Sequence, residues 1–563
     1  MKRFVCVAVV NLGVALGACG DDNKSGSTPD ATTATTETND PDATTAGDTA
    51  EPDTVEQTPP YANVYHVSPA TTPETEQVTL AHLTSEDGAL TGDYANVRNC
   101  VQDESAASQQ FDLGGFALEV KPCTPEHTAF PNAAGNYLDI VPPTTPAADD
   151  GTFAEVQMYH HMQLIHDYFK EVHGLTNRDM PLDAITNVQA FIGLCGEWAK
   201  LPNAAFIPHE SLSQLPIDLG VDGDAIIFSG TPTKNFAFDA SVIYHEYTHS
   251  ILGNTRLSGV FADTQGINNL PGALNEGYAD YFAATLVGNP AIGAYSLNDL
   301  GDFAICGYQL GSGGNQGRDL SNFRQCPDDL TAEVHADSEI FSSALWEIRE
   351  ELGQVDADRV ILAGVLQLTE TSDFGGAADA TIDAAQDLLG NDGAAKVRAA
   401  FEKRDILECA RVVPVDSVGQ RDIPWTIEAK GVFTPNPYPG YTPGYMQFSV
   451  AVPEGKHQVD LAFTFAAGGF GGAPATPELD VAAKLGTAPI DYQLGFTAGS
   501  TTNDSVSTVA LVDGKASFSG DCLAGQTIVF ALHNKGDTLT LTGVKATFAD
   551  DISGDASYDC PAP

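Results

Sequence analysis

The sequence has little positive charge. Its 563 residues include 26 Lys and Arg against 76 Asp and Glu, which gives a formal net charge of -50. Such a surface repels nucleic acid and anionic lipid, so neither is expected as a partner. It suits a medium in which cations screen the self-repulsion, and the composition therefore favours an exported protein kept soluble by its acidic residues.

The sequence also lacks the apolar run that a stable membrane span requires. The apolar stretch from Phe4 to Leu16 is too short for one, but it follows Lys2 and Arg3 as in a signal peptide, predicted here as residues 1–19. It ends in LGAC, which resembles the bacterial lipobox and predicts acylation of Cys19. The alternative is a plain secretory signal with a chance cysteine. We expect an exported protein that is lipid-anchored at the outer membrane or cell surface, or released, and that meets the membrane only through this anchor.

No pair of cysteines has the CxxC spacing of a thiolate metal site. Without Cys6 and Cys19, eight cysteines are left, and an even number in an exported protein predicts disulfides. Eight cysteines allow 105 pairings. Sequence proximity suggests the pairs Cys100–Cys123, Cys306–Cys326 and Cys522–Cys560.

Composition divides the rest of the chain. Residues 20–60 are acidic and rich in Thr and Pro, with too few apolar side chains to offset the entropy of ordering, so they are predicted to be a disordered tether. Short β-like runs predict a β-rich region over 61–150. Helical patterns at 153–173, 272–287, 336–352, 357–369, 377–390 and 394–404 fall within a predicted domain of residues 151–412. Alternating apolar and polar runs with Gly and Pro turns predict a β-sandwich over 413–563, which we interpret as a substrate- or matrix-binding domain.

The first of these helices carries four histidines, at positions 160, 161, 166 and 173. They raise the alternative of a second metal site. The first three do not share a ligand face and no carboxylate pattern accompanies them, so a structural role is favoured.

The clearest chemical signal is His245-Glu246-Tyr247-Thr248-His249. On a helix that begins near Asp239, two histidines four positions apart lie on one face and can bind one zinc ion, with room for a third ligand and a water. Glu246 is then placed to take a proton from that water. The motif also arises by chance, so it is suggestive rather than decisive.

Three segments downstream strengthen this hypothesis. In Asn275-Glu276-Gly277-Tyr278-Ala279-Asp280, Glu276 can be the third ligand and Asp280 can accept the free N–H of His245. His335 precedes a predicted helix and can donate to an oxyanion, and Arg318 can bind a substrate carbonyl.

In their order and their residues, these motifs resemble those of the thermolysin-type peptidases. The motifs HEYTH, NEGYAD and EVHA are most similar to the fungalysin branch of that class. The resemblance covers about residues 150–410. It implies an α+β fold, with a two-lobed metallopeptidase domain made of an N-terminal α/β lobe and a C-terminal helical lobe, followed here by the all-β sandwich. It also implies an edge strand at Asn203, Ala204 and Ala205 that pairs with the substrate backbone.

The resemblance implies roles for the residues already named. His245, His249 and Glu276 would bind Zn²⁺, Glu246 would be the general base, and the remaining residues would be Asp280 behind His245, His335 at the oxyanion and Arg318 at the substrate. One departure is the absence of a tyrosine between His249 and Glu276, where Val260 and Phe261 occur. Family members often need structural Ca²⁺, and Asp218, Asp222 and Asp224 cluster here, although ordinary turn chemistry explains them equally well.

We therefore expect a monomeric zinc metalloendopeptidase that cleaves extracellular proteins or peptides. An aminopeptidase is the enzymatic alternative, but the Gly-x-Met-x-Asn element typical of those enzymes does not occur. The alternative from another class is a surface-displayed binding protein with an inactive peptidase-like core. The intact set of predicted ligands and Glu246 argues against it.

Overall fold

The computed structural model describes the greater part of the chain from residue 60 onward. The described residues are 60–112, 117–144, 151–200, 202–212, 219–253, 262–263, 266–267, 270–298, 304–305, 308–309, 317–330, 334–369, 372–409, 411–415, 425–427, 442–443, 446–466, 477–491, 502, 504–535, 539–550, 558 and 560. The predicted signal peptide, Cys19, the tether up to residue 59, and Val260 and Phe261 lie outside them.

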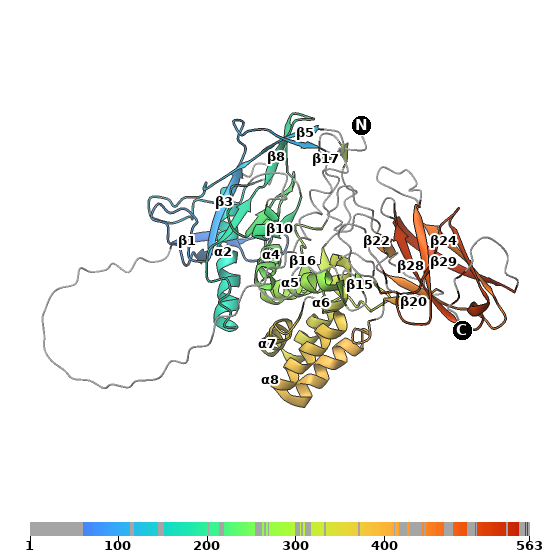
Figure 1. Ribbon diagram of the computed structural model, residues 1–563. Coiled ribbons are helices and arrows are strands. Elements are labelled where there is room, and N and C mark those ends of the chain that lie inside the picture. The colour runs from blue at the N-terminus through green and yellow to red at the C-terminus, as the bar shows by residue number, and fades with distance from the viewer. Residues whose placement is uncertain are drawn as a thin grey trace, which may run out of the picture.

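A five-stranded mixed sheet forms the N-terminal part, blue to green in Figure 1, in the order β10-β11-β7-β3-β6. Strands β3, β7 and β11 are parallel, and β6 and β10 flank them in antiparallel pairing. The strands are β3 (Ala95–Val101), β6 (Thr124–Glu126), β7 (Leu182–Thr186), β10 (Ala204–Ile207) and β11 (Ala225–Phe228). The predicted strand at Asn203–Ala205 is therefore found almost in place, and it is at one end of the sheet.

Two smaller antiparallel sheets accompany it. One has the order β4-β5-β8-β9, and the other pairs β1 with β2. Their strands are β1 (Tyr61–Tyr65), β2 (Thr75–Thr79), β4 (Gln109–Asp112), β5 (Ala117–Pro122), β8 (Gln189–Ile192) and β9 (Glu197–Lys200). The β-rich character predicted for residues 61–150 is thus present in the described strands.

The helices follow the predicted positions closely. They are α2 (Thr152–Asp167), α3 (His209–Leu212), α4 (Ala240–Leu252), α5 (Leu270–Val287), α6 (Val334–Leu352), α7 (Gln354–Val365) and α8 (Phe374–Glu402). Helix α4 begins where predicted, because the Asp239 side chain caps it by accepting from the Ser241 N–H. The helix predicted to reach residue 173 instead changes to a π-helix, η3 (Tyr168–Val172). The two helices predicted between 377 and 404 are joined in α8 across a break at Gly390, whose φ is 75°.

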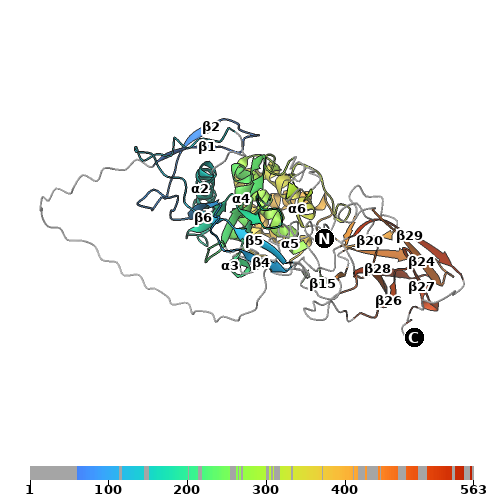
Figure 2. The same cartoon turned by 90° about the horizontal axis from the view of Figure 1, so that it is seen from above.

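Helix α4 is central to this part of the fold. Every residue from Ala240 to Leu252 is buried except His249, which is partly exposed. It packs against α2, α5 and β10, and Figure 2 shows it between the N-terminal strands and α6. Its apolar residues stabilise this position because burial of apolar area is the main favourable term in folding.

The C-terminal strands form two further sheets, orange to red in Figure 1. One has the order β20-β23-β28-β25-β26, with β22 also paired to β28, and the other has the order β21-β29-β24-β27. The strands are β20 (Val412–Pro414), β21 (Trp425–Ile427), β22 (Thr442–Pro443), β23 (Gln447–Ala451), β24 (Gln458–Phe465), β25 (Leu479–Leu485), β26 (Ser507–Ala510), β27 (Lys515–Ser519), β28 (Thr527–Asn534) and β29 (Leu539–Ala549). Buried rings of the two sheets lie together: Phe448 of β23 is 6.0 Å from Phe463 of β24, and Phe518 of β27 is 5.4 Å from Phe530 of β28.

Disulfides link distant parts of the chain. Cys100–Cys123 and Cys522–Cys560 are bonded as predicted. The predicted pair Cys306–Cys326 is wrong, because Cys326 is bonded to Cys409 across 83 positions. Proximity in sequence misleads here because α6, α7 and α8 return the chain to the loop that carries Cys326, a contact that no local pattern encodes. Among the described helices, none combines the length and apolar composition that a membrane span requires.

A buried carboxylate joins three helical segments. Asp358 of α7 accepts hydrogen bonds from the Tyr168 hydroxyl at 2.7 Å, the Tyr281 hydroxyl at 2.5 Å and the Thr285 hydroxyl at 3.1 Å. These donors belong to η3 and α5. The side chain is 2% exposed, so its charge depends on these hydroxyls for solvation.

We expect Asp358→Ala to destabilise the protein by roughly 3 kcal/mol or more, because it leaves three hydroxyls without their acceptor. Asp356→Ala is the matched control. Asp356 lies on the same helix but is exposed, and its ion pair with Arg359 spans 3.7 Å, so its loss should cost less than about 1 kcal/mol. Urea unfolding followed by circular dichroism measures both. Equal effects would contradict the role given to Asp358.

Candidate metal centre

Two buried helices bring the predicted ligand atoms together. His245 and His249 project from one face of α4, and their Nε2 atoms are 3.1 Å apart. Glu276 projects from α5, and its Oε2 is 3.1 Å from the Nε2 of His245 and 3.6 Å from that of His249. Throughout the part of the chain that the structure describes, this is the one group of at least three His, Cys, Asp or Glu residues whose ligand atoms all lie within 4.8 Å of one another.

The other nitrogen of each ring is held from behind. The Nδ1 of His245 is 2.9 Å from Oδ1 of Asp280, and the Nδ1 of His249 is 2.6 Å from Oδ1 of Asn275. Both partners are acceptors, so each Nδ1 donates to its partner, and each Nε2 is the ring atom left to bind a metal ion in place of a proton. Two imidazole nitrogens and one carboxylate oxygen therefore converge on one point. Such an arrangement favours positive charge at its centre.

The protonation equilibria reflect the same electrostatic field. Burial opposes the charge on His245, but the carboxylates of Asp280 and Glu276 outweigh it and raise its pKa to about 10. Burial likewise opposes ionisation of Glu276, yet the neighbouring imidazoles of His335 and His249 and the contacts with His245 and His249 hold its pKa well below the usual range. The site therefore attracts positive charge.

An arginine completes the chain of interactions behind His245. Arg318 of β19 (Arg318–Asp319) donates to both oxygens of Asp280, from Nε at 2.6 Å and from Nη2 at 2.7 Å. Asp280 is fully buried, and although burial raises its pKa, Arg318 and His245 together lower it to about 2. Strand β19 pairs with β16 (Ala291–Ile292), and this pairing fixes the position of the Arg318 backbone. The sequence had assigned Arg318 to the substrate, whereas its described contact is with Asp280.

Glu246 faces the edge strand. Its Oε2 accepts a hydrogen bond from the backbone N–H of Phe206 in β10 at 2.8 Å. On the other side of the same strand, the C=O of Asn203 accepts from the N–H of Ser229. Since backbone groups alternate along an antiparallel strand, those of Ala204 and Phe206 point away from β11, on the side where Glu246 lies.

His335 lies beside the three ligand atoms. It is the second residue of α6, its side chain is 49% exposed, and its Nε2 is 3.6 Å from Oε2 of Glu276. Its exposure leaves it accessible to solvent, unlike His245. The structure thus joins His245, His249, Glu276, Asp280, Arg318 and His335 in one group of contacts and places Glu246 beside β10, whereas Cys19 lies outside the described residues.

The other candidates have different surroundings. His161 is buried between the Tyr244 hydroxyl and the Tyr65 carbonyl, and His166 contacts Asp167 and Asp179. In the predicted calcium cluster, Asp224 accepts from Arg178 and from the His209 N–H. Asp218 lies outside the described residues.

Sequence reasoning missed two partners in the site. Asn275 lies directly before Glu276 in the sequence, and this position is the signal from which its role could be inferred. The N–H of Phe206 carried no signal in the sequence, because a backbone donor is the same in every residue but proline.

Comparison with known proteins finds related sequences. The sequence profile described as fungalysin metallopeptidase (M36) matches residues 144–407. The gelatinase of Enterococcus faecalis is 25% identical over 369 residues, which cover 61% of this chain and 66% of the gelatinase. Extracellular metalloproteinase 4 of Arthroderma gypseum is 27% identical over 233 residues, which cover 35% of this chain and 34% of that protein.

Residues 144–407 are therefore similar in sequence to the fungalysin (M36) metallopeptidases, a family that implies a bound metal. The chain spans just under two thirds of the gelatinase and about a third of the fungal relative. Among solved structures, the precursor of protealysin from Serratia proteamaculans aligns with a TM-score of 0.31 and 16% identity over 58% of this chain and 91% of that one, and no argument rests on it.

The Arg318–Asp280 pair makes a testable prediction about stability. Arg318→Met should destabilise the protein by about 3–5 kcal/mol, because it leaves the fully buried carboxylate of Asp280 without its strongest counter-charge. Arg324→Met is the control, since Arg324 makes a longer, more exposed pair with Glu339 at 3.7 Å, and should cost less than about 1 kcal/mol. Thermal unfolding in the presence of chelator measures both. The prediction fails if the two variants unfold together.

Proposed function

We propose that the protein is a zinc-dependent metalloendopeptidase that hydrolyses peptide bonds of extracellular proteins. The observation that carries the proposal is the convergence of three ligand atoms from His245, His249 and Glu276, which lie 3.1–3.6 Å from one another. The fungalysin match over residues 144–407 and the metalloproteinase names of the relatives support it.

The donor set fits zinc. Ligand atoms about 2.0–2.1 Å from a tetrahedral zinc ion are about 3.3 Å from one another. The three distances here are 3.1, 3.1 and 3.6 Å, so an ion of this size fits between the atoms without rearrangement. Three protein ligands leave a fourth position open, as in catalytic rather than structural zinc sites. When bound, zinc would polarise the scissile carbonyl and lower the pKa of the attacking water.

The side chains around the site would then move the protons and hold the charge. Glu246, the general base, would take the proton of the water and return it to the leaving amine. Its hydrogen bond from Phe206 orients the carboxylate beside the edge of the sheet. His335 would donate to the oxyanion. Asp280, held by Arg318, keeps His245 in the tautomer that offers Nε2 to the metal. A contact between Arg318 and a substrate carbonyl stays a prediction.

We infer that the substrate adds a strand to β10. The backbone groups of Ala204 point away from β11, so they are offered to an extended peptide. The N–H of Phe206 is engaged by Glu246. A peptide paired with this edge therefore has its backbone next to the general base. Such pairing favours a substrate that extends on both sides of the cleaved bond. This supports an endopeptidase over an aminopeptidase.

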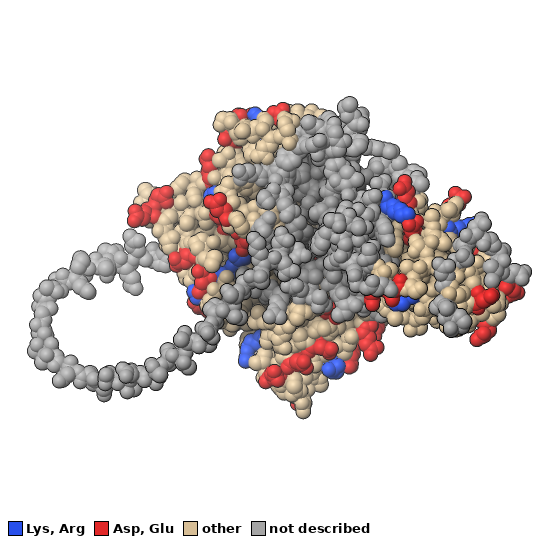
Figure 3. Space-filling view, in the orientation of Figure 1, with Lys and Arg blue, Asp and Glu red and all other residues tan. Residues whose placement is uncertain are grey.

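The remaining assignments complete the proposal. A two-lobed catalytic domain over residues 151–412 is supported by the sheets before α4 and the helices after it. A β-sandwich over 413–563 is supported by the ring contacts between its two sheets. The signal-like N-terminus and the extracellular fungal relative support export, with Cys19 as a lipid anchor. Figure 3 shows acidic residues outnumbering basic ones over the visible face, in keeping with a protein that binds neither nucleic acid nor anionic lipid by charge.

The central test separates metal binding from catalysis. Glu246→Gln should keep zinc and lose at least about a hundredfold in the rate of casein hydrolysis, because it keeps the ligands and removes the base. Glu350→Gln, an exposed change on α6, should retain both. Zinc is measured by atomic absorption and cleavage by release of fluorescent peptides. If Glu246→Gln cleaves as fast as the unchanged protein, the mechanism is wrong, and the alternative of an inactive binding protein gains support if neither protein cleaves.

A second test addresses Asn275. Asn275→Ala should weaken zinc binding by about 10–100-fold, because it removes the acceptor that fixes the ring of His249. Competition with a chromogenic chelator measures the affinity, and Asn322→Ala, on an exposed turn, is the control. An unchanged zinc affinity in Asn275→Ala would show that the ring is oriented by other means.

A further inference from the structure

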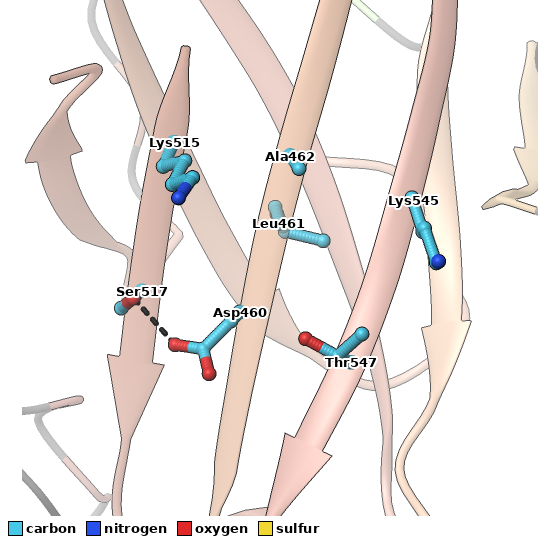
Figure 4. Close-up of a pocket in the computed structure, with 7 residues that line it drawn as sticks. All are labelled: Asp460, Leu461, Ala462, Lys515, Ser517, Lys545 and Thr547. Carbon is cyan, nitrogen blue, oxygen red and sulfur yellow. Dashed lines mark hydrogen bonds between the residues drawn. The ribbon is translucent and has the colours of Figure 1, made fainter. Parts of the chain in front are cut away.

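The outer face of the four-stranded C-terminal sheet carries a hollow far from α4 in sequence. Strand β24 lies between β27 and β29, and side chains from all three strands line the hollow. Figure 4 shows the polar side chains and Ala462 on the outer face of the three strands, whereas Leu461, which is buried, belongs to the opposite face. The lining residues are Asp460, Leu461, Ala462, Lys515, Ser517, Lys545 and Thr547.

Strand register arranges the polar residues in two rows. Ala462 is directly opposite Lys515 on one side and Lys545 on the other, so two lysines flank one small residue. Two positions along β24, Asp460 is opposite Ser517 and Thr547 in the same way. Because neighbouring strands are about 4.8 Å apart, the backbones of the two lysines are about 10 Å apart across the floor made by Ala462.

The two lysines differ from the others of this region. Lys456, Lys484 and Lys535 each form an ion pair with an aspartate. Lys515 and Lys545 form none with any carboxylate in the described part of the chain, although acidic residues outnumber basic ones about threefold in the sequence.

The carboxylate in the next row is already committed. Asp460 accepts hydrogen bonds from Ser517 at 2.5 Å and from the Gln458 amide at 2.7 Å. None of the ion pairs of the described residues joins it to Lys515 or Lys545, and it can still accept from a ligand through its remaining lone pairs.

We propose that this hollow binds acidic polysaccharide, with the carboxylate of a uronic acid unit between Lys515 and Lys545 and its hydroxyls on the row of Ser517, Asp460 and Thr547. Two ammonium groups flanking a gap are complementary to one carboxylate. Sugar hydroxyls both donate and accept, which suits a row made of one carboxylate and two hydroxyls. The inference concerns binding alone and does not depend on peptidase activity.

An acidic peptide fits the hollow less well. Strand β24 is paired on both sides, so its backbone offers no edge to which a peptide can add. A second carboxylate on a peptide would also meet Asp460 in the neighbouring row, where like charges repel. A uronate unit places hydroxyl groups there instead.

The experiment measures binding to the full chain by calorimetry at about 0.15 M salt, where long-range charge effects are screened. The probes are tetragalacturonate, the neutral galactose tetrasaccharide and tetraglutamate. Tetragalacturonate should bind, and Lys515→Gln and Lys545→Gln should each weaken it at least about tenfold, as expected for loss of a charge-assisted hydrogen bond. Lys456→Gln, which removes a lysine already paired with Asp550, should leave it unchanged.

A further variant keeps the test independent of folding. Ala462→Asp places a carboxylate between the two lysines from within the protein and should abolish binding while both lysines remain. Circular dichroism and casein cleavage should match the unchanged protein in every variant. The proposal is overturned if tetragalacturonate does not bind, if the neutral sugar or tetraglutamate binds as tightly, or if the two lysine variants bind as the control does.

Discussion

Three ligand atoms held within 3.1–3.6 Å of one another are the constraint on which the rest of the structure depends. They come from two helices, so α4 and α5 must be packed in a fixed register for the atoms to meet. The burial of nearly all of α4 provides this register, because a one-residue rotation would expose apolar side chains and bury polar ones. The polar centre therefore depends on the apolar packing around it.

A chain of charges extends from this centre into the protein. His245 contacts Asp280, and Asp280 accepts from Arg318, so a negative and a positive group alternate behind the ligand. Each buried charge needs the next one, since an unpaired ion in this environment would be costly. Asn275 gives His249 a neutral partner instead. The two histidines are thus fixed by different means, His245 by a carboxylate and His249 by a neutral amide.

The sequence predicted the parts of this site that depend on local periodicity. His245 and His249 four positions apart, and Glu276 with Asp280 four positions apart, each define one helix face, and both pairs are on helices close to the predicted bounds. It did not predict the partner of Arg318, the bond from Phe206 to Glu246, or the pairing of Cys326. Each of these joins segments distant in sequence, and only the packing of the whole domain determines which of them meet.

The distribution of positive charge follows from its scarcity. In a chain with a net charge of -50, an arginine or lysine has many acidic residues as potential partners. Arg98, Arg178 and Lys484, for example, each form an ion pair with an aspartate. Among the described ion pairs, none includes Lys515 or Lys545. Ala462 lies between these two lysines, and the aspartate of the neighbouring row, Asp460, accepts from Ser517 and Gln458. Arg318 differs from these lysines, because its guanidinium donates to both carboxylate oxygens of the buried Asp280. The same scarcity thus yields one cation that supports the metal centre and two that face the solvent.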